Sequence, residues 1–272
     1  MPATEAAPPR APRAPRSRRR GPGWVPNQHG AWAMLVAPFV VGALDSGPTW
    51  RQVPLLLLWL TGYLAFFAAG LWLRSRCKGR YWPPVRTYGV VTAALGAVVV
   101  ALAPELLRWV PVYLPLLAVS LWCSWRRADR TYLNDGVTIV AACLMTVVVT
   151  ALGSHPAVGA GLPGAGWLPG AGSTRAWLLA AVLATYFGGT VLYVKTLIRD
   201  RGDARVWAAS AAYHVVACVA AFLVDPWVGA LFAVLAVRAA VVPRRWPGIT
   251  PARIGAGEVV ATITLAALLL VG

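Results

Sequence analysis

Long apolar runs separated by short polar breaks fill most of the sequence. Nine runs stand out, and they cover residues 28–45, 53–73, 87–104, 110–124, 135–152, 175–197, 206–224, 227–242 and 254–272. A helix of about 20 mostly apolar residues crosses the hydrocarbon core of a bilayer. The pattern therefore predicts an all-α, polytopic membrane protein with about nine transmembrane helices.

The composition agrees with this pattern. Of the 272 residues, 58% are hydrophobic and only 12% are charged, which excludes an ordinary soluble domain. Residues 1–26 differ from the rest, because they contain Pro, Ala and six Arg without an apolar period. They predict a disordered cytoplasmic tail ahead of a single transmembrane domain at residues 27–272. The uncharged, Gly- and Pro-rich break at residues 153–174 predicts a flexible loop.

The positive charges alternate with the predicted spans. If the N-terminus lies in the cytoplasm, 22 of the 25 Lys and Arg residues fall in the tail and the cytoplasmic loops, which leaves Arg51, Arg108 and Arg175 outside. Cytoplasmic loops of membrane proteins carry such an excess of cations. We therefore predict a multi-pass protein of the cell membrane with a cytoplasmic N-terminus. The net charge of +16 is attributed to Arg-rich cytoplasmic loops that face anionic lipid headgroups, and no nucleic-acid partner is expected.

Polar side chains collect at the predicted cytoplasmic ends of six spans, including the stretch "YVKTLIRDRGD" at residues 193–203. Two of them, His214 and Glu258, fall within apolar runs. An ionisable group inside a membrane costs roughly 2.5–3.5 kcal/mol on insertion scales, so it usually faces a cavity or a partner. The clustering predicts a polar cavity that opens to the cytoplasm.

Each of these residues also has a purely structural interpretation. Asp203 follows Gly202 and is suited to cap the seventh span, and Arg199 is spaced to pair with Asp203. The cations between Arg74 and Arg80 fit an ordinary membrane anchor. A hydrogen bond between His214 and Glu258 would satisfy both side chains without any chemistry.

Three strings resemble a known family. "NQHGAWAMLVAPFVVGAL" in the first span, "YVKTLIRDRGD" at the end of the sixth and "RIGAGEVV" at the start of the ninth resemble the YwiC-like family of bacterial integral membrane proteins. The resemblance extends from about residue 24 to the end of the chain. It implies a helical membrane fold over this region.

The chain also resembles, more distantly, the UbiA-type intramembrane prenyltransferases, which have nine helices, a cytoplasmic N-terminus and an active site near the cytoplasmic face. "LIRDRGD" is similar to a shortened form of their second acidic motif, and Pro38 to Gly42 is similar to a step in their first helix. The resemblance implies a UbiA-like bundle in which Asp200 and Asp203 bind Mg²⁺ and a diphosphate, with Lys195 and Arg199 nearby.

The first acidic motif of those enzymes is missing here. The corresponding stretch, "GLWLRSRCKGRYWPP", contains four cations and no carboxylate. One acidic cluster holds Mg²⁺ weakly, so the magnesium-dependent mechanism is in doubt. Arg binds phosphate directly through its fork of donors. We therefore predict an anion-binding group made of Arg74, Arg76, Lys78, Arg80 and Arg199.

Two hypotheses follow. The first is a UbiA-like transferase that acts on an isoprenoid or another anionic amphipathic lipid, with candidate catalytic residues His29, Lys195, His214 and Glu258. The alternative is a non-enzymatic carrier or accessory protein that binds a lipid or a quinone, and the missing acidic motif favours it. Neither hypothesis names a protein partner.

Overall fold

A computed structural model of the chain describes residues 23–26, 29–155 and 161–272, with the side chain of His29 left out. Nine α-helices lie within these residues: α1 (His29–Asp45), α2 (Gln52–Arg74), α3 (Trp82–Leu102), α4 (Val110–Trp125), α5 (Tyr132–Thr150), α6 (Thr174–Ile198), α7 (Ala204–Val224), α8 (Pro226–Arg245) and α9 (Pro251–Val271). Short 3₁₀ turns, η1 (Gly79–Tyr81) and η2 (Pro104–Trp109), precede α3 and α4. Eight of the helical segments are long and apolar enough to cross a membrane, and α1 is a shorter apolar helix. The predicted all-α, multi-pass membrane fold is confirmed.

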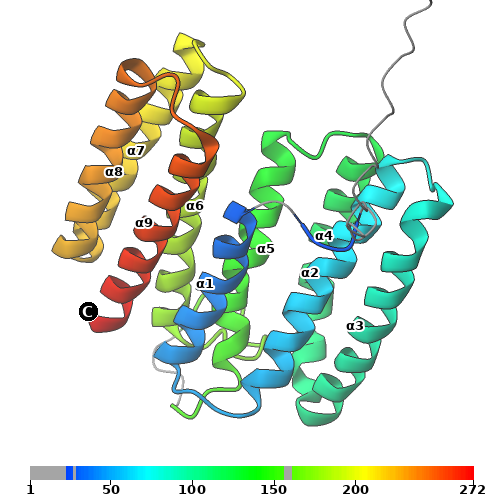
Figure 1. Ribbon diagram of the computed structural model, residues 1–272. Coiled ribbons are helices and arrows are strands. Elements are labelled where there is room, and N and C mark those ends of the chain that lie inside the picture. Colours follow the sequence, from blue (N-terminus) through cyan, green and yellow to red (C-terminus); the bar gives the residue numbers. More distant parts are fainter. Residues whose placement is uncertain (1–22, 27–28, 156–160) are drawn as a thin grey trace, which may run out of the picture.

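Helices α1 and α5 occupy the middle of the bundle, with α2, α3 and α4 on one side and α6, α7, α8 and α9 on the other (Figure 1). Successive helices alternate in direction, so α1, α3, α5, α7 and α9 all begin at one end of the bundle. We call this the cationic end, because it carries the exposed Arg and Lys side chains of the helix connections. The helix ends that carry the predicted polar residues meet there.

A glycine allows α1 to pack closely on α5. A Cβ atom added at Gly42 would lie 2.4 Å from the backbone oxygen of Thr146, a distance that no side chain tolerates. The Thr146 hydroxyl in turn donates a hydrogen bond of 3.0 Å to the carbonyl oxygen of Pro38. Small residues and interhelical hydrogen bonds are the usual means of holding membrane helices together, because lipid supplies little hydrophobic driving force.

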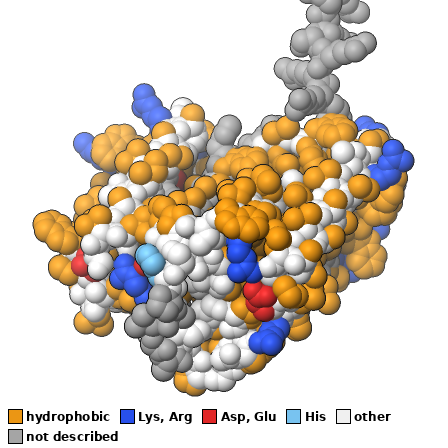
Figure 2. All heavy atoms as spheres, turned by 90° about the horizontal axis from the view of Figure 1, so that it is seen from below, with side chains coloured by type: hydrophobic (Ala, Val, Ile, Leu, Met, Phe, Trp, Pro, Cys, Tyr) orange, Lys and Arg blue, Asp and Glu red, His pale blue; other side chains and the backbone are white. Residues whose placement is uncertain are grey.

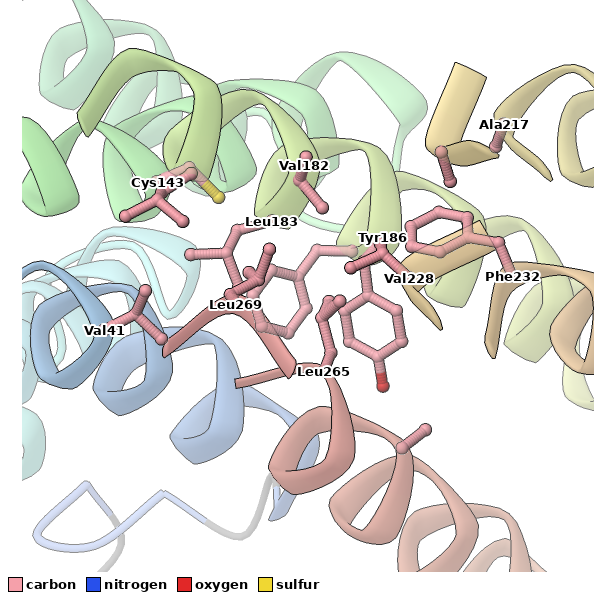
Figure 3. Close-up of a cluster of buried hydrophobic side chains, with 14 of the residues drawn as sticks. Val41, Cys143, Val182, Leu183, Tyr186, Ala217, Val228, Phe232, Leu265 and Leu269 are labelled. Carbon is pink, nitrogen blue, oxygen red and sulfur yellow. The ribbon is translucent and has the colours of Figure 1, made fainter. Parts of the chain in front are cut away.

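A large apolar cluster joins α1 and α5 to the α6–α9 side of the bundle. Its most buried members come from six helices and include Val41, Leu183, Tyr186, Val228 and Leu265 (Figure 3). The Tyr186 hydroxyl points toward α9, where it meets polar groups. This cluster fixes the positions of α6 and α9 relative to each other.

The three cations at the opposite end of the bundle are all engaged. Arg175 pairs with Asp45, Arg51 lies 3.6 Å from Glu105, and the Arg108 guanidinium donates to the Trp167 carbonyl oxygen at 3.3 Å. Figure 2 views this end and shows a few positive and negative side chains beside one another among hydrophobic and uncharged groups. The end is therefore close to neutral.

The described parts of the break predicted as a flexible loop pack against the helix ends. Leu168 and Ala171 are buried, and the Trp109 indole donates to the Pro169 carbonyl oxygen at 3.0 Å. Of the predicted tail, residues 23–26 are described, and the Trp24 carbonyl oxygen accepts a 2.6 Å hydrogen bond from Tyr88 on α3. The rest of the predicted tail lies outside the described residues.

Candidate functional site

A cavity of about 540 Å³ lies between α1, α2, α4 and α5, with its polar end at the cationic end of the bundle. This volume is within the usual range for small-molecule sites. The lining positions on α2 run from Trp59 to Arg74, which corresponds to about 22 Å of helix. The cavity is therefore a long slot parallel to the helices.

The walls of the slot are apolar and rich in aromatic rings. They are formed by Met34, Leu35, Trp59, Tyr63, Phe66, Phe67, Leu71, Tyr113, Leu114, Leu116, Leu117, Val137 and Ala141, among others. Leu114 and Leu117 on α4 are also 59% and 43% exposed on the side of the bundle. These two leucines therefore combine a slot-lining position with substantial exposure.

The mouth of the slot is a network of hydrogen bonds centred on Asp129. This residue lies in the turn between α4 and α5, and its two carboxylate oxygens contact Arg74 at 3.0 Å and the Ser124 hydroxyl at 2.7 Å. The Asn134 amide donates to the Asp129 carbonyl oxygen and accepts from Ser120. Arg74, which was predicted to bind an anion, is thus already paired with a carboxylate.

Lys195 joins the mouth of the slot to α6. Its ammonium group lies 2.6 Å from a carboxylate oxygen of Asp135, which lines the slot, and 3.5 Å from the centre of the Tyr132 ring. Lys195 and Arg199 both donate to the carbonyl oxygen of Arg130. Lys195 therefore contacts a lining residue without lining the slot itself.

The other predicted anion-binding residues lie apart from the slot. Arg76, Lys78 and Arg80 are exposed in the connection between α2 and α3 and do not line it. Within the described residues none of the three forms an ion pair with a carboxylate, and Arg80 donates to the hydroxyl of the neighbouring Tyr81 and lies over its ring. Of the four cations in this stretch, Arg74 alone is brought to the mouth.

The two carboxylates that the UbiA resemblance assigns to Mg²⁺ lie in the connection between α6 and α7 and do not line the slot. Asp203 caps α7, because its Oδ1 accepts hydrogen bonds from the backbone N–H groups of Arg205 and Val206 at 2.8 and 3.4 Å. Across the described parts of the chain, no group of three or more His, Cys, Asp or Glu side chains is placed to hold a metal ion. Mg²⁺ usually keeps several waters and is held by one or two carboxylates together with substrate phosphates, so a role for Asp200 and the second oxygen of Asp203 stays a prediction.

Glu258 belongs to a second, buried polar group between α6, α8 and α9. Its side chain is 7% exposed and lies 2.7 Å from the Arg238 guanidinium. The other carboxylate oxygen accepts hydrogen bonds from Tyr186 at 3.1 Å and from Thr190 at 2.8 Å. Arg238 also stacks over the ring of Tyr193. Both oxygens of the Glu258 carboxylate are therefore engaged.

His214 on α7 lies beside this group. Its Nδ1 is 2.7 Å from the carbonyl oxygen of Ser210, and a carbonyl only accepts, so Nδ1 carries the proton. Nε2 faces Gly189, where an added Cβ atom would lie 3.0 Å away. The narrow space shared by His214 and Arg238 has no room for a water molecule. Neither His214 nor Glu258 lines the slot, and the side chain of His29, at the start of α1, lies outside the described residues.

Two partners in these groups were not predicted. Arg238 had a clear signal, since a single cation within the apolar stretch "FAVLAVRAAVV" requires a partner or a cavity. The sequence signal for Asp129 was weaker, because it rests only on Asp129 being the single carboxylate in the cationic stretch "WRRADRT". Which cation each carboxylate meets depends on the lateral packing of helices, which the sequence pattern does not give.

The fold and the slot define a multi-pass helical membrane protein with an amphipathic internal cavity. The model of the family described as YwiC-like protein matches residues 25–150. The uncharacterised protein YwiC of Bacillus subtilis is 32% identical over 209 residues, which cover 76% of this chain and 77% of that protein. An uncharacterised protein of Haemophilus influenzae is 27% identical over 207 residues, covering 74% and 78%. The chain belongs to the YwiC-like family, and no solved structure matches it.

Proposed function

We propose that the slot binds an amphipathic lipid, of isoprenoid or similar type, with its polar end at the mouth and its chain along the apolar walls. The observation that carries the proposal is the slot itself, about 540 Å³ in volume and polar at one end only. The path from the bilayer that we propose passes the exposed slot-lining residues Leu114 and Leu117 on α4. Such a ligand matches the polarity of the slot along its whole length.

We further propose that the protein lies in the cell membrane with its cationic end toward the cytoplasm. The distribution of Lys and Arg supports this orientation. The three cations at the other end add little net charge, because two are paired with carboxylates. The polar end of the lipid would then face the cytoplasm.

Binding without chemistry, as in a carrier or accessory protein, has more support than the UbiA-like transferase. The transferase hypothesis assigns the metal to Asp200 and Asp203, and neither residue lines the slot. Its candidate catalytic residues Lys195 and Glu258 are held in ion pairs. We propose that these pairs, and His214 beside the second, hold the helices in place, and no step of the proposed function requires a metal.

The test is native mass spectrometry of the protein purified in mild detergent, with a variant that fills the slot. Ala141→Trp places a large side chain on the α5 wall, whereas Ala94→Trp places it on the exposed face of α3 as a matched control. We expect a copurifying lipid in the wild type and in Ala94→Trp, and at least a tenfold loss in Ala141→Trp. Equal occupancy in all three proteins would place the lipid outside the slot and overturn the proposal.

A further inference from the structure

The charged groups at the mouth of the slot cancel one another. Three of the residues that line the slot are charged, and they are Arg74, Asp129 and Asp135. Arg74 pairs with Asp129 at 3.0 Å, and Lys195 reaches Asp135 from outside the slot at 2.6 Å. Within these two pairs, two cations face two carboxylates and the charges balance, while Arg127 and Arg199 lie outside the slot and donate to the carbonyl oxygens of Arg74 and Arg130.

A phosphate or diphosphate headgroup does not suit this mouth. Such a group would lie beside two carboxylates, and like charges in a partly buried site repel strongly. It would also have to compete with Asp129 for Arg74, since charge-assisted pairing of a guanidinium with one anion uses the donors that the other needs. The sites that bind phosphate tightly have an excess of cations, which the lining of this slot lacks.

Carboxylate oxygens give the mouth a surplus of hydrogen-bond acceptors. An ionised carboxylate has about four acceptor positions and no donor. Asp129 uses one position for Ser124 and one for Arg74, and Asp135 is contacted through a single oxygen. The hydroxyls of Ser120 and Ser124 already donate within the network. A hydroxyl on the ligand would find free acceptors here.

Resting on the proposed function, we infer that the slot selects a lipid whose polar end is an uncharged hydroxyl group, such as a long-chain isoprenoid alcohol. The hydroxyl donates to Asp129 or Asp135, and the chain lies against the aromatic walls of α2 and α4. Other exposed cations near this end of the bundle do not change this preference, because they lie outside the slot and act through water, where salt screens them; they are Arg76, Lys78, Arg80, Arg127, Arg130 and Arg199.

The test compares three probes with the same chain and different ends: farnesol, farnesyl phosphate and farnesyl diphosphate. Each is titrated against delipidated protein by native mass spectrometry, at low and at high concentration of volatile salt. We expect farnesol to bind at least tenfold more tightly than the diphosphate, with the monophosphate between them and no effect of salt on farnesol. Tighter binding of the diphosphate than of farnesol at high salt would overturn the inference.

Charge variants at the mouth give the inference a second, independent readout. Asp129→Asn removes one negative charge and frees Arg74, so binding of farnesyl phosphate should strengthen about tenfold while that of farnesol changes little. Asp135→Asn changes the charge in the same direction, and it replaces Asp129→Asn in this measurement if the first variant does not fold. Glu105→Gln, at the opposite end of the bundle, is the matched control. Unchanged phosphate binding in both mouth variants would contradict the charge-balance argument.

Failure of the proposed function gives a different result. If none of the three probes binds more weakly to Ala141→Trp than to the wild type, the slot is not the lipid site and the headgroup question does not arise. If all three lose affinity in Ala141→Trp but the diphosphate is the tightest, the slot binds lipid and only the inference about the headgroup is wrong.

Discussion

At the scale of single residues, buried ionisable side chains are the most demanding feature of this sequence. Glu258 and Arg238 lie within apolar helices, where each alone would be costly. Their 2.7 Å contact and the hydroxyls of Tyr186 and Thr190 offset that cost. Removing one partner of a buried pair leaves an uncompensated charge, which is worse than removing both.

We therefore expect unequal effects from the two single variants. Arg238→Met leaves the buried Glu258 carboxyl without its cation, and should lower the free energy of unfolding by about 3 kcal/mol. Glu258→Gln should cost less, about 1–2 kcal/mol, because Arg238 is 19% exposed and stacks on Tyr193. The double variant should be more stable than Arg238→Met alone. Unfolding by sodium dodecyl sulfate in mixed micelles measures all three.

The surface pair at the other end of the bundle is the control for that series. Arg175 pairs with Asp45 but is 44% exposed, so Arg175→Met should cost at most about 1 kcal/mol. If Arg238→Met were no more harmful than Arg175→Met, or if the double variant were the least stable, the buried pair would not stabilise the protein as described.

At the scale of helices, the sequence predicted which helices exist and their order along the chain, but not which helix faces contact one another. Apolar runs locate spans because a membrane helix must be apolar over its whole length. The third helix begins at Trp82, five residues before the predicted run, because Pro83 and Pro84 suit a first helical turn while Arg86 lowers the local hydropathy. The slot could not be predicted, since it depends on which faces of α1, α2, α4 and α5 meet.

The α1–α5 contact depends on one residue without a side chain. In Gly42→Ala the added methyl group would meet the Thr146 backbone oxygen, which forces the helices apart. We expect a loss of about 1–3 kcal/mol in the free energy of unfolding, as for other overpacked sites. Gly89→Ala on α3 is the control, because nothing lies within 4 Å of its added Cβ, and it should be neutral or slightly stabilising. Similar losses in both variants would indicate a general effect of replacing glycine rather than a close helix contact.

At the scale of the whole molecule, charge is strongly asymmetric between the two ends. The sequence predicted this asymmetry, because only the count of Lys and Arg on alternate connections is needed. The structure adds that the few cations at the opposite end are engaged by Asp45, Glu105 and the Trp167 carbonyl oxygen. Both facts favour an orientation with the cationic end in the cytoplasm.

The native cysteines allow this orientation to be measured. Cys77 is exposed in the connection between α2 and α3 at the cationic end, whereas Cys123 and Cys143 are buried and Cys218 lies within the apolar helix α7. A membrane-impermeant maleimide should therefore label the protein in inside-out vesicles and not in spheroplasts, and Cys77→Ser should abolish the signal. In the Cys77→Ser background, Ser154→Cys at the opposite end should be labelled in spheroplasts, which confirms that the reagent reaches the outer face. Labelling of Cys77 in intact spheroplasts would show the reverse orientation, and the polar end of the slot would then face the outside of the cell.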